Sequence, residues 1–222
     1  MKEKVVTLEA ALEKFQDGQT IMFGDWHGEL SAEEIITGLL EKGVKDIEAI
    51  AVSGGMPDQG VGRLINEHRV NKLITTHIGL NPVAGQQMFA GELEVEFVPQ
   101  GTFAERVRCG GAGLGGVLTP TGIGTDVERG KQRLIIDGKE YLLELPLHAD
   151  YALCRASICD KFGNFSCAKA TKNFNHVMAM AADTVILGAE KVVEIGEVDV
   201  DTFTTAGVYV NYIVGGEQPW QI

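Results

Sequence analysis

The chain has 222 residues, 45% of them hydrophobic, and is long enough to bury one substantial core, so we expect a single domain over residues 1–222. Its formal net charge of −12 argues against nucleic acid or an anionic membrane as the main partner, since both require clustered Lys and Arg. No run of 18 apolar residues occurs and the first residues lack the apolar core of a signal peptide, so we expect a cytoplasmic protein.

The cysteines and glycines indicate which kinds of structural and binding site the chain contains. The four cysteines are not spaced as paired zinc ligands, and a domain of this size does not need disulfides. We predict reduced, mostly buried thiols, with a metal site as the alternative. The 28 glycines cluster at the ends of predicted elements, which indicates tight turns and backbone that approaches a ligand. The cysteines are Cys109, Cys154, Cys159 and Cys167.

The first half of the chain alternates between helix and strand patterns. Apolar runs that end near Gly, Ser or Pro predict four strands, at residues 20–23, 47–52, 72–78 and 93–98. Apolar residues at three-to-four spacing predict helices at residues 7–16, 31–42, 61–68, 81–91 and 102–110. Asn81 is expected to cap the fourth helix, and Ser31 with Glu34 and Thr102 with Glu105 match capping boxes.

The second half breaks this alternation. Residues 110–125 hold seven glycines and no periodicity, which predicts a long ordered loop. Asp137 and Gly138 separate two apolar segments and indicate a β-hairpin. A helix is predicted at 173–182, and strands at 151–157, 184–187, 192–195 and 208–214. The predicted fold is α/β, with an open, mainly parallel sheet, helices on both faces and a β-hairpin region in the second half.

The common sequence motifs of nucleotide-binding and hydrolase sites are either absent or in the wrong structural context. Residues 111–116 satisfy G-x-G-x-x-G, but a helix precedes them where the dinucleotide fingerprint needs a strand, which argues against nicotinamide binding. The chain has neither a P-loop nor a G-x-S-x-G nucleophile elbow.

Two loop residues are the first candidates for a site. Gln100 follows the fourth predicted strand, at the kind of strand-to-helix junction where ligands of open α/β sheets gather. His27 lies in the loop after the first strand, and such loops often carry function. Glu29, Glu33 and Glu34 near His27 suggest acid/base work, but the last two are better explained by a helix dipole. The other histidines are interpreted as structural: His68, His77, His148 and His176.

Six segments carry a resemblance to a known family, in the family's order: 91–96 (GELEVE), 99–102 (PQGT), 104–108 (AERVR), 110–113 (GGAG), 119–122 (TPTG) and 172–175 (KNFN). They resemble the family I CoA transferases, in their α subunit or N-terminal half. The resemblance implies the CoA transferase/NagB-like fold. It also implies an enzyme that moves CoA between a short-chain acyl-CoA and an acid such as acetoacetate, acetate or butyrate. CoA is then a substrate, and no permanently bound cofactor or metal is expected.

The same resemblance implies a partner. In such enzymes a glutamate carboxylate attacks the acyl-CoA thioester, and the reaction passes through an enzyme-bound anhydride and a glutamyl-CoA thioester. The family's glutamate lies in a Ser-Glu-Asn-Gly segment, which this sequence lacks. The chain is therefore expected to hold no catalytic nucleophile and to act with a β subunit, in an α2β2 assembly.

The resemblance assigns positioning roles to this chain. Gln100 would donate its amide N–H to the carboxylate of the acid. Backbone amides near three glycines would line the acyl site or the oxyanion of the thioester: Gly24, Gly54 and Gly113.

The sequence departs from the family's glycine signature after Gly24. Asp25 and Trp26 stand where the family has Gly and Phe, Leu30 and Ala32 replace a later Gly and Pro, and Gly54 replaces a frequent Asn. These changes indicate an altered substrate pocket, so Asp25, Trp26 and His27 join the candidate substrate contacts.

Two alternatives stay open. The first is the same reaction on a branched, hydroxy, amino or dicarboxylic acid, which the replacements at Asp25, Trp26 and Gly54 suggest. The second is a sugar-phosphate isomerase or a regulatory binding domain on the same type of sheet, because fold does not fix function. The second predicts activity or ligand binding by this chain alone.

Overall fold

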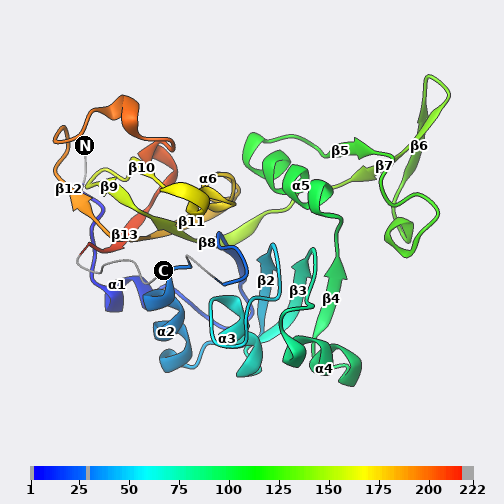
Figure 1. The fold of residues 1–222 in the computed structure, drawn as a ribbon, viewed down its shortest axis with the longest axis horizontal. Coiled ribbons are helices and arrows are strands. Elements are labelled where there is room, and N and C mark those ends of the chain that lie inside the picture. The colour runs from blue at the N-terminus through cyan, green and yellow to red at the C-terminus, as the bar shows by residue number, and fades with distance from the viewer. Residues whose placement is uncertain (1–2, 29–30, 217–222) are drawn as a thin grey trace.

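The structure is a computed structural model that describes residues 3–28 and 31–216, and it is organised around a seven-stranded sheet (Figure 1). All neighbouring strands in this sheet are parallel. In spatial order the strands are β13 (Tyr212–Gly215), β11 (Ala182–Ala189), β8 (Ala149–Ala156), β1 (Thr20–Phe23), β2 (Ile47–Ala51), β3 (Val70–Thr75) and β4 (Glu94–Phe97). From β1 the following strands are added one after another toward β4, and from β8 they are added in the opposite direction toward β13. The strand order therefore reverses between β1 and β8.

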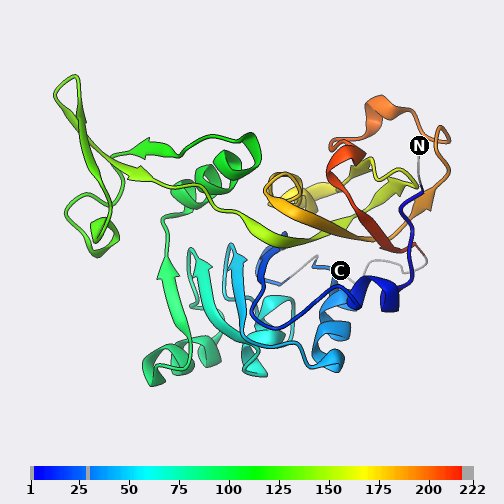
Figure 2. The ribbon, with the colours of Figure 1, turned by 180° about the vertical axis from the view of Figure 1, so that it is seen from behind.

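Helices cover both faces of this sheet, which confirms the predicted fold class (Figure 2). Successive side chains of a strand point to opposite faces, so Ile21 and Phe23 of β1 join one core cluster while Met22 joins the other. The first face packs against α1 (Leu8–Leu12), α2 (Glu33–Lys42), α3 (Val61–Asn66) and α4 (Pro82–Ala90). The second face packs against α5 (Gln100–Ala112) and α6 (Asn175–Met178).

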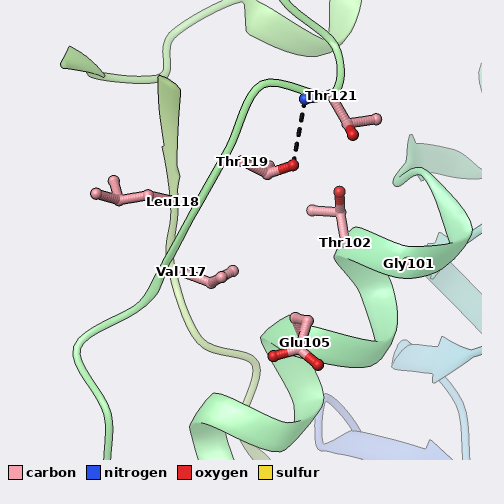
Figure 3. Close-up of a pocket in the computed structure, with 7 residues that line it drawn as sticks. All are labelled: Gly101, Thr102, Glu105, Val117, Leu118, Thr119 and Thr121. Carbon is pink, nitrogen blue, oxygen red and sulfur yellow. Dashed lines mark hydrogen bonds between the residues drawn. The ribbon is translucent and has the colours of Figure 1, made fainter. Parts of the chain in front are cut away.

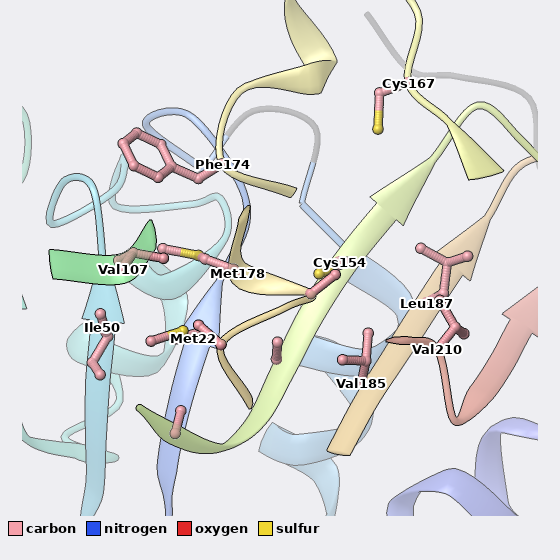
Figure 4. Packing of buried hydrophobic residues seen from close by; sticks show 14 of the residues in the cluster. Met22, Ile50, Val107, Cys154, Cys167, Phe174, Met178, Val185, Leu187 and Val210 are labelled. Atoms are coloured by element: carbon pink, nitrogen blue, oxygen red, sulfur yellow. The ribbon is translucent and has the colours of Figure 1, made fainter. Parts of the chain in front are cut away.

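The cluster on the second face joins the two halves of the sheet (Figure 4). Met22 and Ile50 from β1 and β2 lie beside Met178 of α6 and Val107 of α5, all of them at most 1% exposed. Cys154 of β8 belongs to the same cluster. Burial of such apolar surface is the main stabilising contribution to the fold.

A three-stranded antiparallel sheet extends away from the body as an arm (Figures 1 and 2). Its strands, in spatial order, are β5 (Val117–Thr119), β7 (Lys139–Glu144) and β6 (Arg133–Ile136), and a 3-10 turn η1 (Asp126–Glu128) lies between β5 and β6. Asp137 and Gly138 have φ of 51° and 73°, as a two-residue type I′ turn requires. The predicted hairpin is confirmed.

A second small sheet lies beyond the carboxyl end of β8. It contains β10 (Phe165–Ser166), β9 (Ile158–Asp160) and β12 (Val192–Val193), and the intervening chain forms the 3-10 turns η2 (Lys169–Lys172), η3 (Val200–Thr202) and η4 (Gly207–Tyr209). The strand predicted at 208–214 is therefore η4 followed by β13, and the helix predicted at 173–182 shortens to α6.

Both predicted capping boxes are wrong. The N-cap of α2 is Ala32, and the Ser31 hydroxyl instead lies 2.9 Å from the carbonyl oxygen of Gly28. The N-cap of α5 is Pro99, so Thr102 lies inside the helix, which continues to Ala112 into the region predicted as a loop. The cap at Asn81 is confirmed, because its side chain accepts from the amides of Val83 and Ala84.

Gly24 ends β1 at a position with no space for a side chain. A Cβ atom there would lie 2.2 Å from Oδ1 of Asn175. Asn175 is buried and fixed, because its Oδ1 accepts from the Arg155 amide at 2.8 Å and its Nδ2 donates to the Thr171 carbonyl at 2.8 Å. The glycine therefore permits the first residue of α6 to lie directly on the end of β1.

Gly24→Ala is expected to destabilise the fold by about 1–3 kcal/mol, the usual cost of overpacking a filled site. Urea unfolding of the purified protein measures the change. Gly85→Ala in α4 is the matched control: no atom lies within 4 Å of its Cβ position, and alanine favours a helix over glycine by about 0.5–1 kcal/mol. Equal stability changes in the two variants would contradict the packing role of Gly24.

Candidate functional site

The loops that follow β1, β2, β3 and β4 all leave the same edge of the sheet, because parallel strands end together. Ligands of open α/β sheets bind outside the carboxyl ends of the strands, beside the point where strand order reverses. Here the order reverses between β1 and β8, so the loop from Gly24 to Gly28 lies at that point. Glu29 and Leu30, which continue this loop, lie outside the described residues.

Three polar side chains from successive strand ends form a cluster. Nδ1 of His27, after β1, lies 3.2 Å from Oγ of Ser53, after β2. The ring of His77, after β3, meets the His27 ring edge to face, with centroids 5.0 Å apart. The centroid of the Trp26 ring lies 4.4 Å from that of the His27 ring, and Trp26 is 39% exposed. We call Trp26, His27, Ser53 and His77 the strand-end cluster.

The sequence singled out His27 and Trp26 from this cluster but missed Ser53 and His77. Ser53 directly follows the predicted strand 47–52, a signal like the one that selected His27, whereas His77 lies inside the predicted strand 72–78 and two residues after the observed β3. His27 has φ of 56°, a left-handed conformation that few non-glycine residues adopt and that often marks a functional loop.

The Asp25 carboxyl group is buried below the loop that carries Trp26 and His27. Its Oδ1 accepts from the Gly28 amide at 3.3 Å, and the side chain packs against Gly60 at the start of α3. The pKa of Asp25 is raised to about 7, mainly because the carboxyl group has lost its solvent and in part because the Glu33 carboxylate is nearby, while the amides of Gly28 and Val61 partly offset the rise. Asp25 thus supports the loop from inside.

Gly24 and Gly54 lie near the cluster, but their amides are already engaged. The N–H of Gly24 donates to the Leu153 carbonyl at 3.1 Å, and that of Gly54 donates to the His77 carbonyl at 2.9 Å. The Gly54 carbonyl in turn accepts from the Asn81 side chain at 3.1 Å. In this arrangement these two glycines fix the loops against each other and do not offer their own N–H groups to a ligand.

Gln100 is the first residue of α5 and is exposed. The α5 N-terminus has no side-chain cap, so the first amides of the helix stay available and favour an anion. A pocket of about 320 Å³ opens between this first turn and β5, and Figure 3 shows the Thr102 and Thr119 hydroxyls on its two sides. The lining residues are Gly101, Thr102, Glu105, Val117, Leu118, Thr119 and Thr121. The Glu105 carboxylate in this pocket is paired with Arg108 at 2.8 Å.

The predicted site residues do not all come together. Gly24, Asp25, Trp26, His27 and Gly54 lie at adjacent strand ends. Gln100 follows β4, and β4 lies three strand spacings from β1 in the sheet. The two strands are therefore about 14 Å apart. Gly113 caps the opposite end of α5 in a left-handed conformation, roughly 20 Å from Gln100 at 1.5 Å per residue. The left-handed cap position alone accounts for a glycine at residue 113, so no ligand contact is needed to explain it.

A buried ion-pair network stabilises the other side of the reversal point. Arg155 of β8 donates to both oxygens of Glu34 at 3.0 and 2.9 Å, which ties the first turn of α2 to the sheet. Glu190, after β11, lies 4.0 Å from the same guanidinium. Burial raises the pKa of Glu190 to about 7, although Arg155 opposes this shift.

The cysteines are all free and buried, as predicted. Burial raises the pKa of the Cys159 and Cys167 thiols to about 12, which keeps them protonated. Among residues 3–28 and 31–216, no group of three or more His, Cys, Asp or Glu side chains is arranged to hold a metal ion. In the same part of the chain, no helix combines the length and apolar character needed to cross a membrane.

The raised pKa of Asp25 predicts a pH-dependent stability. An aspartate ionises near 3.9 in an unfolded chain, so between about pH 4 and pH 7 the folded state holds a proton that the unfolded state has lost. Stability from this group therefore falls as the pH rises through that window. Asp25→Asn should be more stable than the wild type by an amount that grows from pH 5 to pH 8.5, reaching the order of 2–4 kcal/mol. Thermal unfolding at several pH values checks this, and a difference that is constant with pH would contradict it.

Comparison with known proteins identifies the family. The model of the Coenzyme A transferase family matches residues 5–216. The acetate CoA-transferase subunit alpha of Escherichia coli K12 is 47% identical over 218 residues, with coverage of 98% of this chain and 99% of that protein. The acetoacetyl-CoA:acetate/butyrate CoA transferase alpha subunit of Clostridium acetobutylicum is 46% identical, with coverage of 96% and 98%.

A solved structure shares the fold. The acyl-CoA transferase of Escherichia coli O157:H7, in a thioester complex with CoA, superposes with a TM-score of 0.90 at 22% sequence identity. The match covers 100% of this chain and 48% of that one, so the chain spans about half the length of that enzyme. From the family match and the two close relatives, we conclude that the chain belongs to the Coenzyme A transferase family.

Proposed function

We propose that this chain is the α subunit of a transferase that moves CoA between a short-chain acyl-CoA and a carboxylic acid, with acetate, acetoacetate and butyrate as the first acids to test. The main support is 46–47% identity, over nearly the whole chain, to two proteins named as α subunits of acetate or acetoacetyl-CoA transferases. CoA is a substrate in this reaction, and the chemistry needs no resident cofactor. The family match over residues 5–216 supports a single transferase domain.

A separate β subunit would supply the nucleophile. The sequence has no Ser-Glu-Asn-Gly segment, and the chain corresponds to about half of a single-chain acyl-CoA transferase. The partner's glutamate would attack the thioester carbonyl and release CoA as a thiolate, leaving an acyl-glutamyl anhydride. The thiolate would then attack the glutamyl carbonyl, which frees the first acid and forms glutamyl-CoA. Two copies of each subunit, α2β2, are the assembly that we propose.

Gln100 would hold the acid while the glutamate reacts. Its exposed position on the uncapped N-terminus of α5 supports this role, because the side-chain amide and the helix dipole both favour a carboxylate. The neighbouring pocket between α5 and β5 gives the bound molecule room on the side of the arm. A neutral amide also keeps the carboxylate reactive, which a tightly paired cation would not.

The chain's departures from the family's glycine signature affect which acid we expect the enzyme to use. Trp26 and His27 bring aromatic rings to the strand-end cluster, whereas Asp25 is buried below it. A substituted acid is therefore the second candidate substrate. An isomerase or regulatory binding domain on the same fold would instead act without a β subunit.

A mass-spectrometric exchange assay tests the proposal. This chain, alone and co-expressed with its β subunit, is offered several acyl-CoAs and a panel of carboxylic acids. New acyl-CoA species are expected only from the complex. Transfer by the lone chain would place the nucleophile here, and the absence of transfer by both preparations would favour a binding domain.

Substitution of Gln100 tests the positioning role. Gln100→Ala in the complex is expected to lower kcat/KM for the acid by about tenfold or more, which corresponds to one lost hydrogen bond to a charged group. Gln86→Ala, at an exposed glutamine in α4, is the control and should change kcat/KM less than twofold. Similar kinetics in both variants would rule out Gln100 as a substrate contact.

A further inference from the structure

The 3-10 turn η2 carries two lysines beside the loop that follows β1. Lys169 and Lys172 are both exposed, and they are the first and last residues of the turn. Residues three apart in a 3-10 turn lie on the same side of it. Asn173, the next residue, donates from its side chain to the Asp25 carbonyl. The two lysines therefore lie close to the point where the strand order of the sheet reverses.

The backbone of this turn is held in an unfavourable conformation. Lys169 and Asn173 have φ of 52° and 23°, in the left-handed region that few non-glycine residues adopt. Side-chain hydrogen bonds hold the turn on two sides: Asn175 donates to the Thr171 carbonyl at 2.8 Å, and Asn173 donates to the Asp25 carbonyl. Strained residues that their surroundings fix in this way cluster at ligand sites. The turn therefore presents both lysines from a fixed backbone.

No carboxylate neutralises the two lysines. Within residues 3–28 and 31–216, neither of them forms an ion pair. Other cations of this half of the chain are paired, Arg155 with Glu34 at 2.9 Å and Lys161 with Glu194 at 2.7 Å. In a chain with a net charge of −12, two unpaired lysines on one turn form a local site that attracts anions. Lysine commonly binds phosphate groups as a point charge.

The distance of this turn from Gln100 fits the length of CoA. In an acyl-CoA the sulfur is bonded to the carbonyl carbon of the acyl group that Gln100 would hold. The arm between the sulfur and the first phosphorus has about 13 bonds and spans about 15 Å when extended, because three bonds of an extended chain span about 3.4 Å. Gln100 follows β4, which lies about 14 Å from β1, and η2 is bonded to the loop after β1.

The acid itself is a poor candidate for the two lysines. Acetate and butyrate are too short to reach from η2 to the end of β4, about 14 Å away in the sheet. A tight pair with two cations would also make the carboxylate less reactive. The phosphates of CoA take no part in the transfer, so strong pairing there leaves the reacting groups unaffected.

We propose that Lys169 and Lys172 bind the phosphate groups of CoA while the acyl group lies at Gln100. This inference rests on the proposed transferase function and assigns a binding site for one of its substrates. Contacts to a remote, unreactive part of a substrate can help to orient its reacting end.

The test uses the co-expressed complex with acetate as acceptor and two donors, butyryl-CoA and butyryl-pantetheine, which has the same arm without the phosphates. Lys169→Gln and Lys172→Gln are each expected to raise the KM of butyryl-CoA about threefold, and about tenfold together, since each removes one exposed charge contact. The KM of butyryl-pantetheine should not change. Lys172→Arg keeps the charge and should keep the wild-type KM. Lys139→Gln, at an exposed lysine of the arm, is the control and should change neither KM.

Salt provides a second measurement that needs only butyryl-CoA. Added NaCl screens exposed charges, because the Debye length falls from about 10 Å at 0.1 M to about 3 Å at 1 M. The KM of butyryl-CoA should therefore rise more steeply with NaCl in the wild type than in the double variant. The same salt dependence in both proteins would overturn the phosphate site.

The outcomes separate this inference from the function on which it rests. Transfer with an unchanged KM for butyryl-CoA in the double variant overturns the phosphate site alone. An equal rise in the KM of both donors also overturns it, because the lysines then act on the structure and not on the phosphates. A complex that transfers the acyl group of neither donor refutes the transferase function and this inference together.

Discussion

The contact between Asn175 and Gly24 is the constraint on which the arrangement of the site depends. Asn175 fills the space that a side chain at Gly24 would need, and it bonds to the backbone of β8 through Arg155. Two residues earlier, Asn173 donates from its side chain to the carbonyl of Asp25. Asn173 and the start of α6 therefore fix the end of β1 and the loop that follows, at the place where the strand order reverses. His27 extends from this fixed loop to Ser53 after β2 and His77 after β3.

The division of the sheet into two halves explains how distant parts of the sequence meet. β1 to β4 build outward in one direction and carry the strand-end cluster and Gln100. β8, β11 and β13 build in the other direction, and β8 carries Arg155, whose amide donates to the Asn175 side chain and whose guanidinium donates to Glu34. The chain as a whole supplies binding and orientation, and the proposed chemistry places the reactive carboxylate on another chain.

Sequence patterns predicted the central strands well because β1 and β2 are buried apolar runs with a glycine or a serine close behind them. Helix starts were predicted poorly, since a capping-box pattern is only local. In the predicted box of α2, the Ser31 hydroxyl instead donates to the Gly28 carbonyl, and Glu34 pairs with Arg155, 121 residues away. The site was predicted in part: Gln100 and His27 follow strands, but Ser53 and His77 gain their roles only from neighbours on adjacent strands. The buried position of Asp25 depends on Gly60, which no local pattern connects to it.

If this chain positions the acid while a partner's glutamate forms the covalent bond, intact-mass spectrometry of the complex will show which chain carries the bond. The complex is incubated with acyl-CoA without an acceptor acid, quenched, and the two chains are weighed separately. We expect a mass increase equal to one CoA thioester on the β chain and an unchanged mass for this chain. A CoA adduct on this chain would show instead that the nucleophile lies here.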